Sequence, residues 1–286
     1  MAVYVPRHVF PVEGAENRAE KLDRSACRRI DGLERSPDGF NMALGTSLLA
    51  AHTHCAADPR AAQLPTWEAW VAAMQVGSAL FIAATATGET VPCRIADKLR
   101  TIQATGPQHY TDAGNWLTAF WLAVICREQE RMTQLIHVSL SLLRASGAVF
   151  DDYVYAWVEA LQVAWRQGGD LGELLTAAMD GTAPDSLRVP DQELLLQVLY
   201  PPINLFHRYV ARQHEEFNEA LSDALHWHKE YWSENEERSG SSSGLVALGP
   251  LAVACLARDA GFPIEVESEY LPKHLLTGSW LNEFET

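Results

Sequence analysis

The spacing of apolar residues constrains the fold of this chain more than any other feature. Between residues 16 and 34, four apolar residues follow one another at intervals of four, four and three: Leu22, Ala26, Ile30 and Leu33. These intervals place the side chains on one face of an α-helix. Comparable segments of about 10–20 residues recur along the chain, separated by short connections rich in Pro, Gly or Asp. The sequence therefore predicts an all-α fold.

The short connections favour helices that run antiparallel to their neighbours. Asp112 is placed to cap a helix that continues through Arg127, and Gly168 and Gly169 end an aromatic helix that begins at Asp151 or Asp152. We expect an array of antiparallel helical hairpins, similar to a solenoid or to a tetratricopeptide-like bundle. The sequence contains no repeat of fixed length.

One segment departs from the helical pattern. Val91, Cys93 and Ile95 alternate with more polar residues, and a polar turn separates them from a second short run that ends near residue 103. Alternation with a period of two is typical of a β-strand with one buried face. We therefore expect one small β-hairpin inserted near residues 90–103.

The length and composition are those of a globular protein with a sizeable core. The chain has 286 residues, of which 48% are hydrophobic and 21% are charged. We expect a single helical domain over residues 1–286. The polar stretch 233–244, rich in Ser and Gly, predicts a flexible loop. The alternation of apolar residues with acids after Gly261 predicts an extended C-terminal segment over 262–286.

Negative charge is concentrated in the second half of the chain. The whole chain has 22 Lys and Arg against 37 Asp and Glu, a formal net charge of -15. Residues 1–150 hold 14 of each, whereas residues 151–286 hold 8 bases and 23 acids. Such a balance argues against binding to nucleic-acid backbones or anionic membranes. The acidic half is compatible with a solvated surface and with a face for a basic partner.

The compartment predicted from the sequence is the cytoplasm. The first residues lack the basic region and apolar run of a signal peptide. The most apolar stretch, residues 71–87, is rich in Ala and interrupted by polar residues, which favours a buried helix over a membrane span. The five cysteines are scattered without a paired motif, which predicts reduced thiols in the core.

Two groups of residues have the chemistry of metal ligands, but neither has a complete pattern. Glu219, Asp223, His226 and Glu230 lie along one strip of a helix, where the solvated face of an amphipathic helix is the favoured interpretation. His52 and Cys55 form half of a zinc site, with no second pair at suitable spacing. No hydrolase, metalloprotease, phosphate-loop or dinucleotide motif is present. We predict no catalytic residue, no cofactor and no metal.

Three stretches together resemble a known family. They are residues 104–128, 217–232 and 248–272, and in this order and spacing they resemble the immunity protein 49 family of bacterial polymorphic-toxin systems. The resemblance extends over roughly residues 15–280. It implies a cytosolic protein that neutralises a cognate toxin by binding it, and it supplies no catalytic residues.

The acidic half suggests which residues contact such a toxin. Opposite charge favours a basic partner, such as a nuclease whose own site binds phosphate. The acids predicted to be exposed and to contact the toxin are Asp151, Asp152, Glu234, Glu236, Glu237, Glu265, Glu267 and Glu269.

An alternative function is an enzyme or small-molecule-binding protein built on a helical scaffold. This hypothesis requires an enclosed pocket lined by several Trp and Tyr residues. Its first candidates are polar aromatic residues near helix ends: His109, Tyr110, His207 and Tyr209. Most Trp residues lie at helical spacing on apolar stripes, which is typical of a core. A plain structural scaffold is a third possibility.

Overall fold

A computed structural model describes residues 3–183, 187–188 and 192–281 of the chain. The longer helices are α1 (Ala15–Gly32), α2 (Phe40–Ala57), α3 (Leu64–Thr85), α4 (Ala113–Ile125), α7 (Asp152–Arg166), α8 (Leu171–Asp180), α10 (Pro201–Val210), α11 (His214–Ser233) and α13 (Leu248–Asp259). The shorter ones are α5 (Gln129–Leu135), α6 (Leu140–Arg144), α9 (Gln192–Leu194), α12 (Glu236–Ser239) and α14 (Lys273–Leu276). Short 3-10 turns lie at η1 (Pro37–Gly39) and η4 (Ser242–Gly244), and a π-helical turn lies at η3 (Leu195–Leu199).

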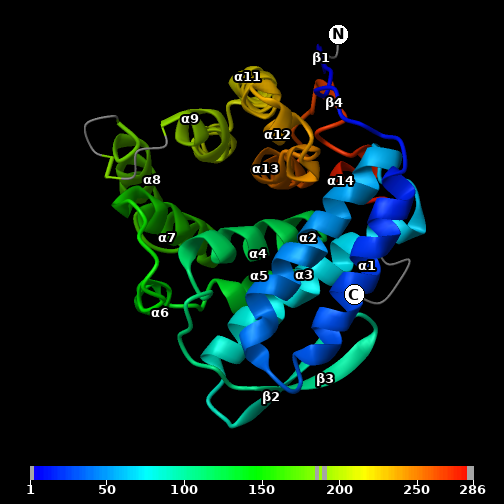
Figure 1. Ribbon diagram of the computed structural model, residues 1–286. Coiled ribbons are helices and arrows are strands. Elements are labelled where there is room, and N and C mark those ends of the chain that lie inside the picture. The colour runs from blue at the N-terminus through cyan, green and yellow to red at the C-terminus, as the bar shows by residue number, and fades with distance from the viewer. Residues whose placement is uncertain (1–2, 184–186, 189–191, 282–286) are drawn as a thin grey trace.

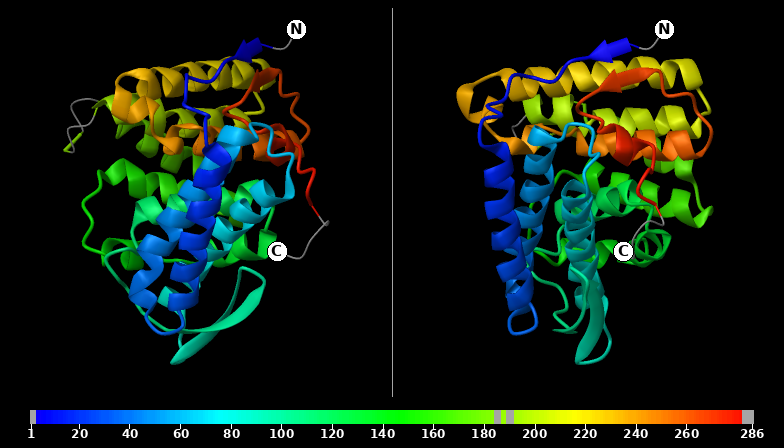
Figure 2. Two further views of the ribbon diagram at one scale, coloured as in Figure 1. Left: turned by 45° about the vertical axis from the view of Figure 1, so that its right-hand side comes forward. Right: turned by 90° about the vertical axis from the view of Figure 1, so that its right-hand side faces the viewer.

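The helices form two tiers (Figures 1 and 2). In the lower tier α2 runs antiparallel to both α1 and α3, against which it packs, with α4 to α8 behind them. Helices α9 to α13 lie across the top, and α11 crosses above the upper end of α1. The predicted all-α fold is confirmed, and consecutive pairs such as α1 with α2 and α10 with α11 pack together.

The predicted β-hairpin is also confirmed. Strands β2 (Thr90–Ile95) and β3 (Lys98–Gln103) are antiparallel, and Ile95 pairs with Lys98. The two turn residues, Ala96 and Asp97, both have positive φ angles, of 50° and 60°. This backbone suits the twist of a two-residue hairpin; Gly adopts it freely, Asn and Asp at a smaller cost than other residues, and Ala with strain.

The strain in this turn yields a test. Replacing Ala96 by glycine removes the clash of its Cβ, and we expect the free energy of unfolding to rise by about 1 kcal/mol. Ala145 has a right-handed backbone at the end of α6, so its Cβ causes no clash. Replacing it by glycine should lower the free energy of unfolding, because glycine only raises the conformational entropy of the unfolded chain. Urea denaturation of the two variants measures both effects, and equal signs would refute the assignment of strain.

Helix α3 is the centre of the core. Among the described helices it alone is long and apolar enough to cross a membrane by composition, yet 78% of its most apolar window is buried inside the protein. Trp70 of α3 and Trp116 of α4 are fully buried. The buried helix predicted for residues 71–87 is therefore confirmed, and the Trp stripes of α3 and α4 are core.

The C-terminal segment is extended only in part. Strand β4 (Val266–Ser268) pairs in parallel with β1 (Val3–Val5), so the beginning of the chain is joined to its last quarter. Helix α14 then follows at Lys273–Leu276. The segment expected to be extended thus contains one strand and one helical turn within the described residues, and 282–286 lie outside them.

The polar stretch 233–244, where a flexible loop is expected, contains short helical turns. It forms α12 and η4, and Asn235 caps α12 by accepting a hydrogen bond from Arg238 N at 2.9 Å. The ring of His228 contacts the Gly244 carbonyl at 2.9 Å, and the ring of His52 contacts the Ser243 carbonyl at 3.1 Å. These contacts from α11 and α2 anchor the segment. The abundance of Ser and Gly in the segment does not predict them, because they come from distant parts of the chain.

Candidate functional site

Helix α11 presents a continuous row of acids to solvent. Its apolar residues Phe217, Leu221 and Leu225 face the core. The opposite side therefore projects outward, and there Glu215, Glu219 and Asp223 are exposed at intervals of four. Glu216, Glu230 and Glu234 are also exposed and continue the row to the end of the helix.

Two neighbouring elements extend this row of acids. Glu236 and Glu237 are exposed on α12, directly after α11. Strand β4 lies beside α11 at the top of the molecule (Figure 1), and Asn218 joins them through bonds to Pro263 O at 2.8 Å and from Glu265 N at 2.7 Å. We call the exposed acids of these three elements, together with Glu234 directly after α11 and Glu265 directly before β4, the acidic face: Glu215, Glu216, Glu219, Asp223, Glu230, Glu234, Glu236, Glu237, Glu265 and Glu267.

The one arginine on α12 is already engaged. Arg238 forms ion pairs with Glu234 of α11 and, at 3.1 Å, with Glu193 of α9. Its guanidinium also lies 3.9 Å from the centre of the Tyr231 ring. These contacts hold α12 against α11 and neutralise Glu234 in part, so most of the acidic face keeps its negative charge.

The predicted contact residues do not all share this surface. Glu234, Glu236, Glu237, Glu265 and Glu267 belong to the acidic face, and Glu269 is half-buried next to it. The expectation that Asp151 is exposed is wrong: it is 6% exposed and accepts a hydrogen bond from Arg188 N at 2.8 Å.

Asp152 lies apart from the acidic face. It begins α7 in the lower tier (Figure 1) and forms ion pairs with Arg144 at 3.5 Å and Arg188 at 3.3 Å. Single-sequence reasoning found the α12 and β4 acids. It missed Glu215 and Glu216, and it interpreted Glu219, Asp223 and Glu230 as a solvated helix face or possible metal ligands and not as partner contacts.

The residues of the two possible metal sites are exposed to solvent, buried in the core, or bonded to backbone carbonyls. Glu219, Asp223, His226 and Glu230 are all exposed, and the His226 ring bonds to the Ser222 carbonyl at 2.8 Å. His52 contacts the Ser243 carbonyl, while Cys55 is fully buried. No cluster of three His, Cys, Asp or Glu residues suited to a metal is found among the described residues.

The four aromatic candidates for an enzymatic pocket fall into two separate places. His109 and Tyr110 precede α4, where the buried Tyr110 hydroxyl donates to Pro37 O at 3.1 Å. Burial raises the pKa of Tyr110 to about 12. His207 and Tyr209 lie on α10, where Tyr209 packs against Phe262. None of the four lines a cavity described for this structure.

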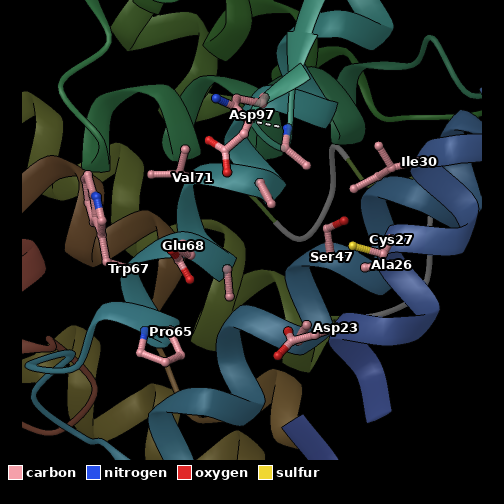
Figure 3. A pocket seen from close by; sticks show the side chains of 15 residues that line it. Asp23, Ala26, Cys27, Ile30, Ser47, Pro65, Trp67, Glu68, Val71 and Asp97 are labelled. Carbon is pink, nitrogen blue, oxygen red and sulfur yellow. Dashed lines mark hydrogen bonds between the residues drawn. The ribbon is translucent and has the colours of Figure 1, made fainter. Parts of the chain in front are cut away.

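A half-open groove of 370 Å³ lies elsewhere, between α1 and α2 on one side and α3 on the other (Figure 3). The turn of the β2–β3 hairpin closes one end with Asp97. Its lining is mainly small and apolar, with Ala26, Ile30 and Val71 among the contributors. Sequence reasoning did not find it, because it is assembled from four separate elements.

Four of the five cysteines are buried thiols, as expected from the sequence. Cys55, Cys93, Cys126 and Cys255 are buried and free, and burial raises the pKa of Cys55 to about 12. Cys27 is free but exposed, and it lines the groove, so the expectation of a core thiol is wrong for this residue.

The fold and the surface define an all-helical protein with a broad acidic face and with no metal cluster among its described residues. A sequence model of the family Immunity protein 49 matches residues 58–275. The chain belongs to this family of immunity proteins. No curated protein and no solved structure matches it.

Proposed function

We propose that this protein protects its cell by binding a basic toxin through the acidic face and blocking the toxin's activity. Membership of an immunity protein family implies a protein toxin as the partner. The observation that carries the proposal is the gathering of ten exposed acids on α11, α12 and β4. A toxin that acts on nucleic acid must attract phosphate, so its active site offers the positive charge that such a face would attract.

The same charge supports a protein that binds neither nucleic acid nor membranes, and the five free cysteines support a location in the reducing cytoplasm. A net charge of -15 repels both phosphate backbones and anionic lipid surfaces. It also accelerates encounter with a basic partner, which matters for an immunity protein because the toxin must be captured before it acts.

The test is binding to the cognate toxin, used in a catalytically inactive form. Changing Glu234, Glu236 and Glu237 to lysine should reduce the association rate at low salt at least about tenfold. Stopped-flow association at several salt concentrations measures the rate. The wild-type rate should fall steeply with added salt, because screening weakens the attraction between exposed charges.

A matched control carries the same change of charge elsewhere. Glu89, Glu130 and Glu173 are exposed and lie outside the acidic face, so their triple lysine variant should lose only the small effect of net charge. If both triple variants bind equally fast, the acidic face is not the contact surface. If the toxin binds neither variant nor the wild type, the proposed function itself fails.

A further inference from the structure

We propose that the groove between α1, α2 and α3 is a second binding site, which takes an apolar peptide segment bearing Lys or Arg. The toxin as the source of this segment rests on the proposed function. The groove lies in the lower tier, and none of the acids of the acidic face lines it.

The charge of the groove selects a cationic occupant. Among the fifteen described residues that line it, three are acids and none is lysine or arginine. Asp23 comes from α1, Glu68 from α3 and Asp97 from the hairpin turn, so the carboxylates lie around the opening and not in one cluster (Figure 3). The ring of His54 contacts Asp23 Oδ2 at 2.9 Å, so Asp23 keeps its second oxygen for a ligand.

The floor of the groove favours a side chain with an aliphatic stem. Ala26, Ile30, Ala50, Val71 and Ala72 line it. Lys and Arg carry hydrocarbon stems that pack on apolar surface while their charged ends reach outward. A bound basic side chain would thus cover the alanines and place its charge among the rim carboxylates.

Two buried polar atoms point to a peptide and not to a simple cation. Ser47 and Trp67 are 1% and 3% exposed, and both line the groove. Ser47 Oγ and Trp67 Nε1 have no hydrogen-bond partner among the described residues. Both atoms can donate a hydrogen bond, and a buried donor without a partner is costly. Backbone carbonyls of a bound segment would satisfy them.

The groove is held open by contacts that do not involve the ligand. Gln75 of α3 accepts a hydrogen bond from Ala96 N at 2.8 Å and fixes the hairpin turn. Arg100 of β3 is buried and pairs with Asp31 of α1 at 2.9 Å. Because both walls are tied to the same hairpin, little ordering is required on binding.

Cys27 makes the site directly measurable, since among the five cysteines it alone is exposed and it lines the groove. The probe is a short synthetic peptide of alternating leucine and arginine, compared with one that carries glutamate in place of arginine. We expect the arginine peptide at millimolar concentration to slow alkylation of Cys27 by a neutral maleimide at least about threefold. Peptide mapping by mass spectrometry identifies the labelled residue.

Conservative variants supply the comparison. The combined variant Asp23→Asn, Glu68→Gln and Asp97→Asn should lose the protection while keeping its circular dichroism spectrum and its melting temperature. Asp97→Gly alone should weaken protection yet raise the melting temperature, because it removes both a carboxylate and a strained φ angle. Loss of binding in a more stable variant cannot be attributed to unfolding.

The proposal is overturned if the arginine peptide leaves the alkylation rate unchanged, or if the glutamate peptide or the combined variant gives equal protection. The toxin separates this result from the proposed function. A toxin that binds through the acidic face while Cys27 stays fully reactive overturns the groove as a toxin site and leaves the proposed function intact. Protection by the arginine peptide with no toxin binding supports the groove and rejects the proposed function.

Discussion

Replacing Arg127 by alanine is expected to lower the free energy of unfolding by about 3–5 kcal/mol, the largest effect of any single substitution considered for this protein. The Arg127 side chain is only 12% exposed. It donates to the carbonyls of Leu275 at 2.7 Å and Leu276 at 2.8 Å, and it pairs with Asp259 at 3.0 Å. Alanine would leave these acceptors without a partner inside the protein.

The position of Arg127 explains the size of the effect. Helix α4 ends at Ile125, and Arg127 follows it with a φ of 57°, which turns its side chain toward α13 and α14. One guanidinium thus ties the end of α4 in the lower tier to the C-terminal part of the chain. Urea and thermal denaturation measure the loss, which corresponds to a melting temperature about 10 °C lower.

Arg24→Ala serves as the control. Its side chain is 58% exposed and pairs only with Glu20 of the same helix at 3.7 Å. Exposed pairs of this kind contribute less than about 1 kcal/mol. If Arg127→Ala were no more destabilising than Arg24→Ala, the contacts with the C-terminal segment would not hold the tiers together.

Acid is expected to unfold the protein well before its carboxylates are fully protonated. His8, His52 and His228 are each about 5% exposed or less and meet where the N-terminal segment, α2 and α11 converge on η4. Burial lowers the pKa of His8 and of His52 from 6.5 to about 4 and that of His228 to about 3. For His8, the nearby cations Arg7 and Lys229 lower the pKa further.

The direction of the pH dependence follows from these values. The unfolded chain binds a proton at each histidine below about pH 6.5, whereas the folded protein takes it up only near pH 4 or below. The stability that the three neutral histidines allow is therefore fully present above pH 6.5, and the free energy of unfolding falls as the pH falls toward 4. Each histidine accounts for about 3 kcal/mol over this range, a large part of the stability of an ordinary domain.

Urea denaturation at a series of pH values measures this loss. The double variant His52→Gln and His228→Gln should be less stable at pH 7 but should lose less stability between pH 6.5 and 4. His226→Gln is the control, because His226 is exposed on the same helix as His228, and it should leave the pH dependence unchanged. A double variant with the wild-type slope would show that these histidines do not govern acid unfolding.

Much of the local structure could be predicted from single segments. Of the predicted apolar stripe, Ala26 and Ile30 of α1 and Leu33 directly after it are buried, and Leu22 is partly buried. Asp112 caps α4 by accepting a hydrogen bond from Asn115 N at 2.9 Å. These features depend on residues within a few positions of one another, for which periodicity and capping chemistry suffice. The three stretches that resemble the family carry the same kind of helix-packing information, and the family match supports it.

The polar stretch 233–244 shows where such reasoning ends. Its composition is typical of a flexible loop, yet His52 and His228 reach it from α2 and α11 and fix it. No local rule links residue 52 with residue 243, because the contact exists only once both tiers have packed. Asp151 is a similar case. It accepts a hydrogen bond from Arg188 N, which is 37 positions away in the sequence, so its burial cannot be inferred from neighbouring residues.

The sequence by itself determined the helical class, the hairpin, the excess of acids in the second half and the family resemblance. The first three follow from composition or from spacing over a few residues, whereas the resemblance rests on three stretches in their order along the chain. Only the tertiary structure decided which acids share a surface, separating Asp151 and Asp152 from α11 and placing Glu265 beside it. It alone assembled the groove from α1, α2, α3 and the hairpin turn. The physical reason is that charge and shape at a surface depend on distances in space, which helix packing sets through contacts remote in the chain.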